Sequence, residues 1–127
     1  MTVGANERIS RFLFSRRWYS PANRRVKADA FIPHPHIELS VSCTEGLDEA
    51  VIWQAGEEAA RMHSNQPTLH GRADLKAESV FNQGLEVIRD DQPLYHANIT
   101  GWPSDGKDVQ RIKALELAAA ATLKLAG

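Results

Sequence analysis

Cysteine and long apolar runs are both scarce in this chain of 127 residues. Cys43 is the single cysteine, which excludes a disulfide within the chain and is typical of a protein from a reducing compartment. No apolar run approaches the roughly 18 residues that a membrane-spanning helix needs, and residues 1–10 lack the apolar core of a signal peptide. We therefore expect a cytoplasmic protein that does not contact membranes.

Motifs that hold phosphates or nucleophiles are also missing. None of the eight glycines belongs to a Gly-x-Gly-x-x-Gly fingerprint or to a loop ending in Gly-Lys-Ser/Thr. The Gly-x-Ser-x-Gly turn of many serine hydrolases is absent as well. These absences argue against a Rossmann oxidoreductase and a nucleotide-driven motor, and we expect no cofactor.

The composition that is present, with 43% hydrophobic and 24% charged residues, is that of an ordinary folded protein. We predict one domain over 1–127, which is long enough to bury a core. The net charge of −1 hides an asymmetry: residues 1–40 carry seven Lys/Arg and three Asp/Glu, whereas residues 41–127 carry eight and thirteen. Such separation can steer an anionic partner or pair two copies of the chain, and an uneven surface without function is the simpler alternative.

Hydrophobic periodicity predicts an α+β domain. Helical spacing of apolar residues predicts two helices, at about 47–62 and 105–126. Alternating segments predict strands at 8–15, 28–32, 37–43, 68–75, 79–81, 85–89 and 95–100. Strands that follow one another through short links are typical of a largely antiparallel sheet, which the two helices would cover. Gly56 weakens the first helix by roughly 1 kcal/mol relative to Ala, which indicates close packing at that point.

Three of the predicted strands each carry a polar face, because side chains alternate along a strand. If these faces align, their Arg, His and Asn side chains form a groove suited to a phosphate or carboxylate. The turn at 101–107 adds free backbone N–H groups at a helix start, although Asp105 and Asp108 compete for them. An ordinary solvent-facing sheet side is the alternative. The polar sets are Glu38, Ser40 and Ser42; His70, Arg72 and Asp74; and His96, Asn98 and Thr100. The residues predicted to bind the ligand are His70, Arg72, His96, Asn98 and Lys107.

The same side chains contain the residue types of an enzyme. A hydrolytic triad is defined by its geometry, which residue types alone do not establish. A histidine that acts as acid or base on a bound phosphate ester is a second enzymatic hypothesis. Cys43 alternates onto the apolar side, where an inert thiol is expected. The residue types of a triad are present in Ser40 or Ser42, His96 or His70, and Asp74.

Two histidines in the His34-Pro35-His36 segment raise the question of a metal site. Imidazole is a common ligand, but a site needs three or four ligands with supporting contacts. No cysteine pair, His-Glu-x-x-His motif or carboxylate cluster supplies the others at a recognisable spacing. We therefore predict an extended polar linker and no metal.

A basic and aromatic segment at about 16–27 is the best nucleic-acid signal in the chain. Its cations can neutralise phosphates, while Trp18 and Tyr19 can stack on unpaired bases. The chain as a whole is slightly acidic, unlike a dedicated nucleic-acid domain. The segment can equally dock on an acidic protein surface or be an ordinary loop. The residues predicted for nucleic-acid or partner binding are Arg16, Arg17, Trp18, Arg24 and Arg25.

The leading functional hypothesis from the sequence is therefore a small cytoplasmic module that binds an anionic ligand. The ligand would be a nucleotide or a nucleic-acid phosphate, held on the polar sheet face and the 101–107 turn. The alternative is an interaction protein, either a homo-oligomer or a small partner subunit, that uses the basic segment. A small enzyme with a histidine acid or base stands third.

Overall fold

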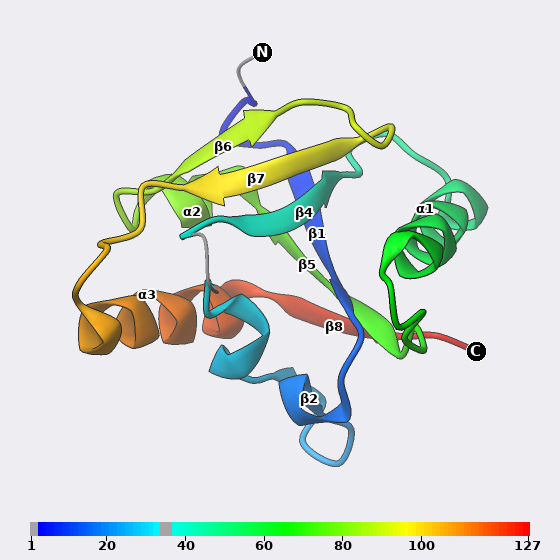
Figure 1. Ribbon diagram of the computed structural model, residues 1–127, viewed down its shortest axis with the longest axis horizontal. Coiled ribbons are helices and arrows are strands. Elements are labelled where there is room, and N and C mark those ends of the chain that lie inside the picture. The colour runs from blue at the N-terminus through cyan, green and yellow to red at the C-terminus, as the bar shows by residue number, and fades with distance from the viewer. Residues whose placement is uncertain (1–2, 34–36) are drawn as a thin grey trace.

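A six-stranded sheet forms the centre of the protein, as seen in a computed structural model that describes residues 3–33 and 37–127 (Figure 1). The strands lie in the order β6-β7-β4-β1-β5-β8, and every neighbouring pair is antiparallel. This architecture confirms the predicted α+β class. The strands are β1 (Arg8–Leu13), β4 (Leu39–Cys43), β5 (Gly71–Lys76), β6 (Glu86–Arg89), β7 (His96–Thr100) and β8 (Thr122–Leu125).

One face of the sheet is apolar and carries the main core. Ile9 and Leu13 of β1 alternate onto this face and join apolar side chains from the other strands. The helix α3 (Lys107–Ala120) packs against it through Ala114 and Leu117, and small side chains such as Ala118 let the helix lie close. The short helix α2 (Ala77–Phe81) and the 3-10 turn η2 (Ala28–Phe31) complete this layer.

The opposite face is polar, yet the helix α1 (Glu49–Met62) packs on part of it. Phe12 of β1, Ile52 of α1 and Leu69 form a second, smaller core there. Gly56 lies at the contact, because a Cβ at this position would stand 2.8 Å from the ring of Phe12. The close packing expected at Gly56 is therefore present. Figure 1 shows β1 and β5 running between α1 and α3, which cover opposite sides of the sheet.

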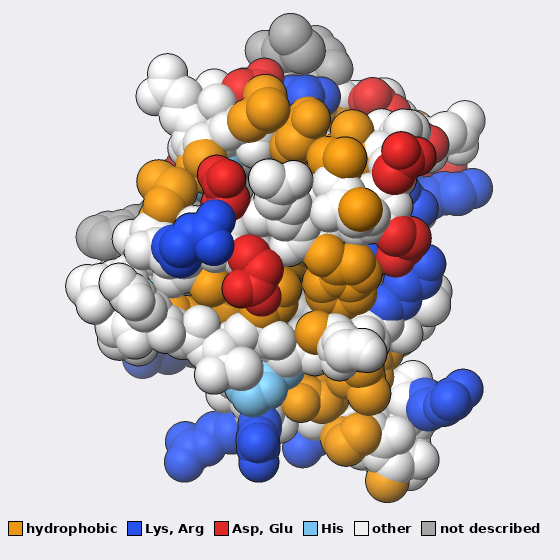
Figure 2. All heavy atoms as spheres, turned by 90° about the vertical axis from the view of Figure 1, so that its right-hand side faces the viewer, with side chains coloured by type: hydrophobic (Ala, Val, Ile, Leu, Met, Phe, Trp, Pro, Cys, Tyr) orange, Lys and Arg blue, Asp and Glu red, His pale blue; other side chains and the backbone are white. Residues whose placement is uncertain are grey.

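The basic segment folds into the 3-10 turn η1 (Arg16–Trp18) and a small hairpin of β2 (Tyr19–Ser20) and β3 (Arg25–Val26). The hairpin lies at the lower end of the molecule in Figure 1. Figure 2 views the molecule from the side of α1. Acidic side chains lie among basic ones in the upper and middle parts of this face, whereas its lower end shows basic side chains and no acidic ones.

Two predicted elements were wrong in type, and one predicted helix was too long. The helix predicted over 105–126 ends at Ala120, and its last residues form the edge strand β8 instead. Thr122 to Leu125 alternate in polarity, and pairing with β5 satisfies backbone groups on what would otherwise be an open edge. Residues 79–81 belong to α2 and residues 28–31 to η2, since runs this short do not distinguish a strand from a helical turn. None of the helices in the described ranges is long and apolar enough to cross a membrane.

Candidate functional site

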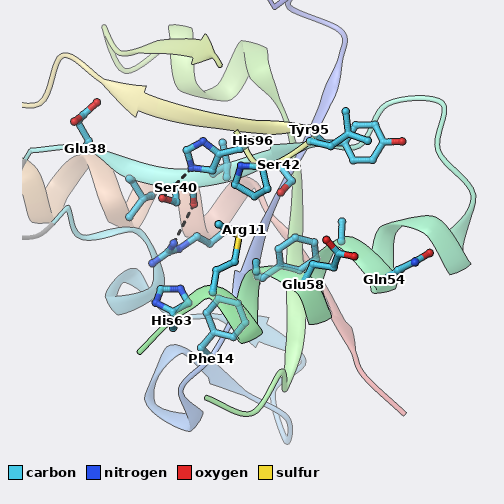
Figure 3. Close-up of a pocket in the computed structure, with 18 of the residues that line it drawn as sticks. Arg11, Phe14, Glu38, Ser40, Ser42, Gln54, Glu58, His63, Tyr95 and His96 are labelled. Carbon is cyan, nitrogen blue, oxygen red and sulfur yellow. Dashed lines mark hydrogen bonds between the residues drawn. The ribbon is translucent and has the colours of Figure 1, made fainter. Parts of the chain in front are cut away.

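A cleft of about 650 Å³ lies between α1 and the part of the polar sheet face that α1 leaves uncovered (Figure 3). It opens because β1 and β4 are paired only at Ile9–Cys43 and Ser10–Ser42, whereas β1 follows β5 over its whole length. Beyond Ser10 the two strands diverge. The cleft is lined by β4 and the loop before β7 on one side, by α1 on the other, and by η1 and the end of β1 below.

The three polar strand faces predicted from the sequence point to the same side of the sheet. Ser40 lies opposite Asn98, and Ser42 lies opposite both His96 and Ser10. Ser10 in turn lies opposite Asp74 of β5. Directly opposed residues of antiparallel strands share a face, so the alignment follows from the register. The helix α1 then divides this shared face into a covered part, around β5, and an open part, around β4 and β7.

Arg72 lies on the covered part and is fully buried. Its Nε donates to the carboxylate of Asp74 at 3.0 and 3.1 Å, and its Nη2 donates to Glu49 of α1 at 2.7 Å. The ring of Trp53 stacks 4.7 Å from the guanidinium, and only Nη1 has no hydrogen-bond partner in the described part of the chain. Burial opposes the charged form, but the bonds to Glu49 and Asp74 outweigh it and raise the pKa of Arg72. The geometry is that of an ion pair that holds α1 on the sheet.

The other predicted ligand residues are dispersed. His96 lines the cleft, whereas Asn98 lies one register step further along β7 and outside the lining. His70 precedes β5, and its ring lies 6.0 Å from that of Tyr19. Lys107 begins α3 on the apolar side of the sheet, so neither it nor the 101–107 turn shares the cleft. Of the five residues predicted to bind the ligand, His96 is the one found in the lining of the cleft within the described part of the chain.

Arg11 is a cleft cation that the sequence reasoning did not single out. Its Nε donates to the carbonyl of Ala30 at 2.9 Å and its Nη1 to the carbonyl of Ser40 at 3.0 Å. Its guanidinium stacks 4.7 Å from the ring of Trp18 and forms an ion pair with none of the described carboxylates. Burial lowers the pKa of Arg11 to about 10, which still leaves it charged at neutral pH. The sequence did contain a signal for Arg11. By strand alternation it falls on the same face as Ile9 and Leu13, where a charged residue among apolar ones is unusual.

His96 lies between the carboxylate of Asp90 and the hydroxyl of Ser40, and Figure 3 shows its contact with Ser40. Its Nδ1 is 2.7 Å from Oδ1 of Asp90, and its Nε2 is 3.2 Å from Oγ of Ser40. An ionised carboxylate only accepts hydrogen bonds, so Nδ1 carries the proton of the neutral ring. Nε2 is then an acceptor, and the hydroxyl of Ser40 donates to it. The side chain of His96 is 19% exposed and is partly shielded, whereas that of Asp90 is 43% exposed and Ser40 is open to the cleft.

The acid that contacts His96 is Asp90 and not Asp74, the acid named in the sequence-based triad. Asp74 is occupied by Arg72 and by the hydroxyl of Ser10. Asp90 reaches His96 because the β6-β7 hairpin brings it beside that residue, and its backbone N–H donates to the carbonyl of His96. Partial burial favours the neutral acid, but hydrogen bonds from His96 and the backbone of Gln92 outweigh it and lower the pKa of Asp90.

The remaining predicted site residues lie at the surface or outside the described ranges. The four arginines of the basic segment are exposed, whereas Trp18 is half-buried and lines the cleft. Cys43 is buried in the main core, and this burial raises the pKa of its thiol. Within the described residues no three His, Cys, Asp or Glu side chains converge as metal ligands, and the 34–36 segment lies outside those residues. The exposed arginines are Arg16, Arg17, Arg24 and Arg25.

No protein-family model matches the chain, and comparisons with curated proteins and with solved structures find no significant match.

Proposed function

We propose that the protein binds a small anionic ligand with an apolar or aromatic body in the cleft between α1 and β4. The observation that carries this proposal is Arg11, a guanidinium that lines the cleft without a carboxylate partner among the described residues. The sequence predicted a nucleotide or a nucleic-acid phosphate, and the proposal keeps the anionic class but extends it to small carboxylates. The site is different, because Arg72 and Lys107 take no part in it.

The charge of Arg11 supports the proposal. Carbonyl oxygens of Ala30 and Ser40 accept two of its N–H groups but bring no negative charge. A bound phosphate or carboxylate would supply that charge and accept further N–H groups in the forked geometry that guanidinium favours. A hydrogen bond to a charged group contributes about 1.5–3 kcal/mol. Glu38 and Glu58 also line the cleft, but both are exposed, so water and salt screen their repulsion.

The lining around Arg11 supports the second part of the ligand description. Phe14 and Trp18 provide aromatic surface at the lower end of the cleft, and Val51, Ala55 and Met62 of α1 provide an aliphatic wall. The cleft volume lies within the roughly 300–1,000 Å³ that small-molecule sites occupy. A nucleoside base or a short acyl chain would therefore bury apolar surface here while its charged group meets Arg11.

The test is a titration with two pairs of probes, AMP with adenosine and octanoate with octanamide. In each pair the probes differ mainly by the negative charge. We expect at least one charged probe to bind about 10-fold or more tightly than its neutral counterpart, which corresponds to about 1.4 kcal/mol. NMR shifts of backbone amides near Arg11 and His96 would report the site. The pair that responds distinguishes a nucleotide site from a carboxylate site.

The matched variants for this titration are Arg11→Gln and Arg111→Gln. Each removes one positive charge, but Arg111 is an exposed residue of α3 on the far side of the sheet. We expect Arg11→Gln to abolish the preference for the charged probe and Arg111→Gln to preserve it. Equal binding of charged and neutral probes by the unmodified protein, or an unchanged preference in Arg11→Gln, would overturn the proposal.

A second candidate function uses the basic segment 16–27. The observation that favours it is that Arg16, Arg17, Arg24 and Arg25 are all exposed and form ion pairs with none of the described carboxylates. Binding of a single-stranded oligonucleotide should then fall steeply with salt and weaken in Arg24→Gln/Arg25→Gln. A protein partner or a second copy of the chain would instead appear as a larger complex in native mass spectrometry. Either role is compatible with the expected cytoplasmic location, which fractionation of cells would test.

A further inference from the structure

We infer that Ser40, His96 and Asp90 act as a nucleophilic relay that hydrolyses a small carboxylic ester bound in the cleft. This inference rests on the proposed function, because the cleft must hold the ester beside Ser40. The inference also goes beyond the proposed function, because a protein that only binds a ligand needs no nucleophile. The sequence supplied serine, histidine and aspartate without any means of choosing among them. The geometry points to this trio.

The hydrogen bonds run in the order that the reaction requires. Asp90 accepts from Nδ1 of His96 at 2.7 Å, which fixes the tautomer and leaves Nε2 as an acceptor 3.2 Å from Oγ of Ser40. A base within hydrogen-bond reach of a hydroxyl, itself oriented by a third group, is the arrangement that activates serine. The three residues come from β4, β7 and the β6-β7 loop, so the sheet register positions them.

The surroundings of Ser40 suit the other requirements of ester hydrolysis. Arg11 donates to the backbone carbonyl of Ser40, which places a cation beside the nucleophile, where negative charge develops on the carbonyl oxygen of the substrate. The hydroxyl faces the cleft and not the core, since Ser40 is exposed and lines the cavity (Figure 3). The aliphatic wall of α1 lies on the opposite side of the cleft, where it would contact the apolar body of the ester.

The reaction balances without any added oxidant or metal. Oγ of Ser40 attacks the carbonyl carbon of the ester while its proton passes to Nε2 of His96. The C–O bond to the leaving group breaks, and the departing alkoxide or phenoxide takes the proton from Nε2. Water then attacks the acyl-Ser40 carbonyl, again giving its proton to His96, and the acid leaves as Oγ recovers a proton. The net change is ester plus water to acid plus alcohol.

A purely structural role, in which these hydrogen bonds only connect β4 to β7, is the alternative to a catalytic role. The two roles predict different reactivities of Ser40. A structural serine would react no faster than any other exposed hydroxyl. An activated one should form a covalent adduct with a fluorophosphonate probe in the folded protein and not after denaturation. Trypsin would release residues 28–61 as one peptide with Ser40 and Ser42 as its serines, and fragmentation in the mass spectrometer would assign the adduct.

Turnover would be measured with two aryl esters, 4-acetoxybenzoate and phenyl acetate, which differ by one negative charge. We expect hydrolysis of at least one ester, with a loss of about 100-fold or more in kcat/KM for both Ser40→Ala and His96→Gln. Asp90→Asn should also reduce turnover, because it removes the carboxylate that fixes the tautomer. Ser104→Ala, in an exposed turn away from the cleft, is the matched control and should leave turnover unchanged. Arg11→Gln should reduce the rate for 4-acetoxybenzoate more than for phenyl acetate.

The outcomes separate this inference from the proposed function. If Ser40→Ala loses turnover yet binds AMP or octanoate as the unmodified protein does, both stand. If charged probes bind through Arg11 while no ester is hydrolysed and no adduct forms on Ser40, the relay is refuted and the binding function survives. If Ser40 hydrolyses esters but Arg11→Gln changes neither probe binding nor substrate preference, the anion site is refuted instead.

Discussion

The sequence and the structure assign opposite roles to Arg72. The sequence predicts that it binds the ligand, whereas the structure indicates that it stabilises the fold. The structure surrounds its guanidinium with Asp74, Glu49 and Trp53 and leaves the side chain fully buried. We therefore expect Arg72→Met to reduce folding stability and to leave probe binding in the cleft intact. Methionine is the informative substitution because it fills similar space and removes only the charge and the hydrogen bonds.

The expected loss can be worked from the contacts. Removing Arg72 leaves the carboxylate of Asp74, whose side chain is 8% exposed, buried without its cation. Breaking a buried ion pair in this way costs about 3–5 kcal/mol. The stack on Trp53 adds about 0.5–2 kcal/mol. Because a domain of this kind is stable by only about 5–15 kcal/mol, the variant should be visibly destabilised and still partly or wholly folded.

A double variant isolates the uncompensated charge as the cause. In Arg72→Met/Asp74→Asn the second change removes the stranded carboxylate while Asn can still accept from Ser10. The double variant should be more stable than Arg72→Met, with a coupling clearly above the roughly 0.5 kcal/mol within which independent sites add. Arg111→Met is the control, because its ion pair with Asp29 is long at 3.7 Å and exposed, and such pairs contribute about 0–1 kcal/mol.

The assay is urea unfolding followed by tryptophan fluorescence, with AMP and octanoate binding measured on the folded fraction. Two results would refute the reasoning. One is an Arg72→Met variant as stable as Arg111→Met. The other is a variant that stays folded and loses binding as completely as Arg11→Gln, which would show that Arg72 contacts the ligand after all.

Three further predictions concern packing, the thiol and acid stability. Gly56→Ala should lose up to about 2 kcal/mol in urea unfolding, because overpacking against Phe12 at 2.8 Å costs about 1–3 kcal/mol and the better helix propensity of Ala returns about 1; a more stable variant would contradict the contact. Cys43 should react with a disulfide reagent only as fast as the protein unfolds, since its thiol is buried and its pKa raised, and rapid reaction of the native protein would contradict this. The hydrogen bond from Arg72 lowers the pKa of Glu49 from 4.5, so this group stabilises the fold above that pH and the contribution disappears as the pH falls through the lower folded value. Unfolding midpoints measured across acid pH should therefore depend less on pH in Glu49→Gln, and an unchanged pH profile would count against the bond.

The fold class and the alignment of polar side chains could be predicted because both follow from period-2 alternation. Ser40 and Ser42 share a parity, as do His96 and Asn98, and any antiparallel pairing of two half-polar strands favours matched faces over mixed ones. The register in the structure does match them. What alternation does not define is which strands are neighbours. It could therefore be predicted that the polar residues of β4 and β7 lie on polar faces that can align. It could not be predicted that Ser40, His96 and Asp90 would come into contact.

The position of α1 could not be derived by the rule that helices cover the apolar face. The overlooked signal was the run Phe12-Leu13-Phe14, in which apolar residues occupy both parities. A strand that is apolar on both sides is covered on both sides. Leu13 joins the main core, while Phe12 receives α1 on the polar face. Because α1 was expected on the apolar face, Arg72 was predicted to lie in an open groove. The sequence pattern contained no indication that Trp53 and Glu49 would lie above it.

The docking of α1 determines which polar side chains are structural and which remain accessible. Over β5 the helix brings Glu49 and Trp53 onto Arg72, whose charge is matched by Glu49 and Asp74. Over β4 the helix stands away from the sheet, and its apolar side chains, together with Gln54 and Glu58, form the wall of the cleft. Arg11 and His96 therefore face a cavity and not a helix. Under the proposed function, a bound anion would supply the counter-charge that Arg11 lacks among the described carboxylates and would offset the free-energy cost of burying an unmatched charge.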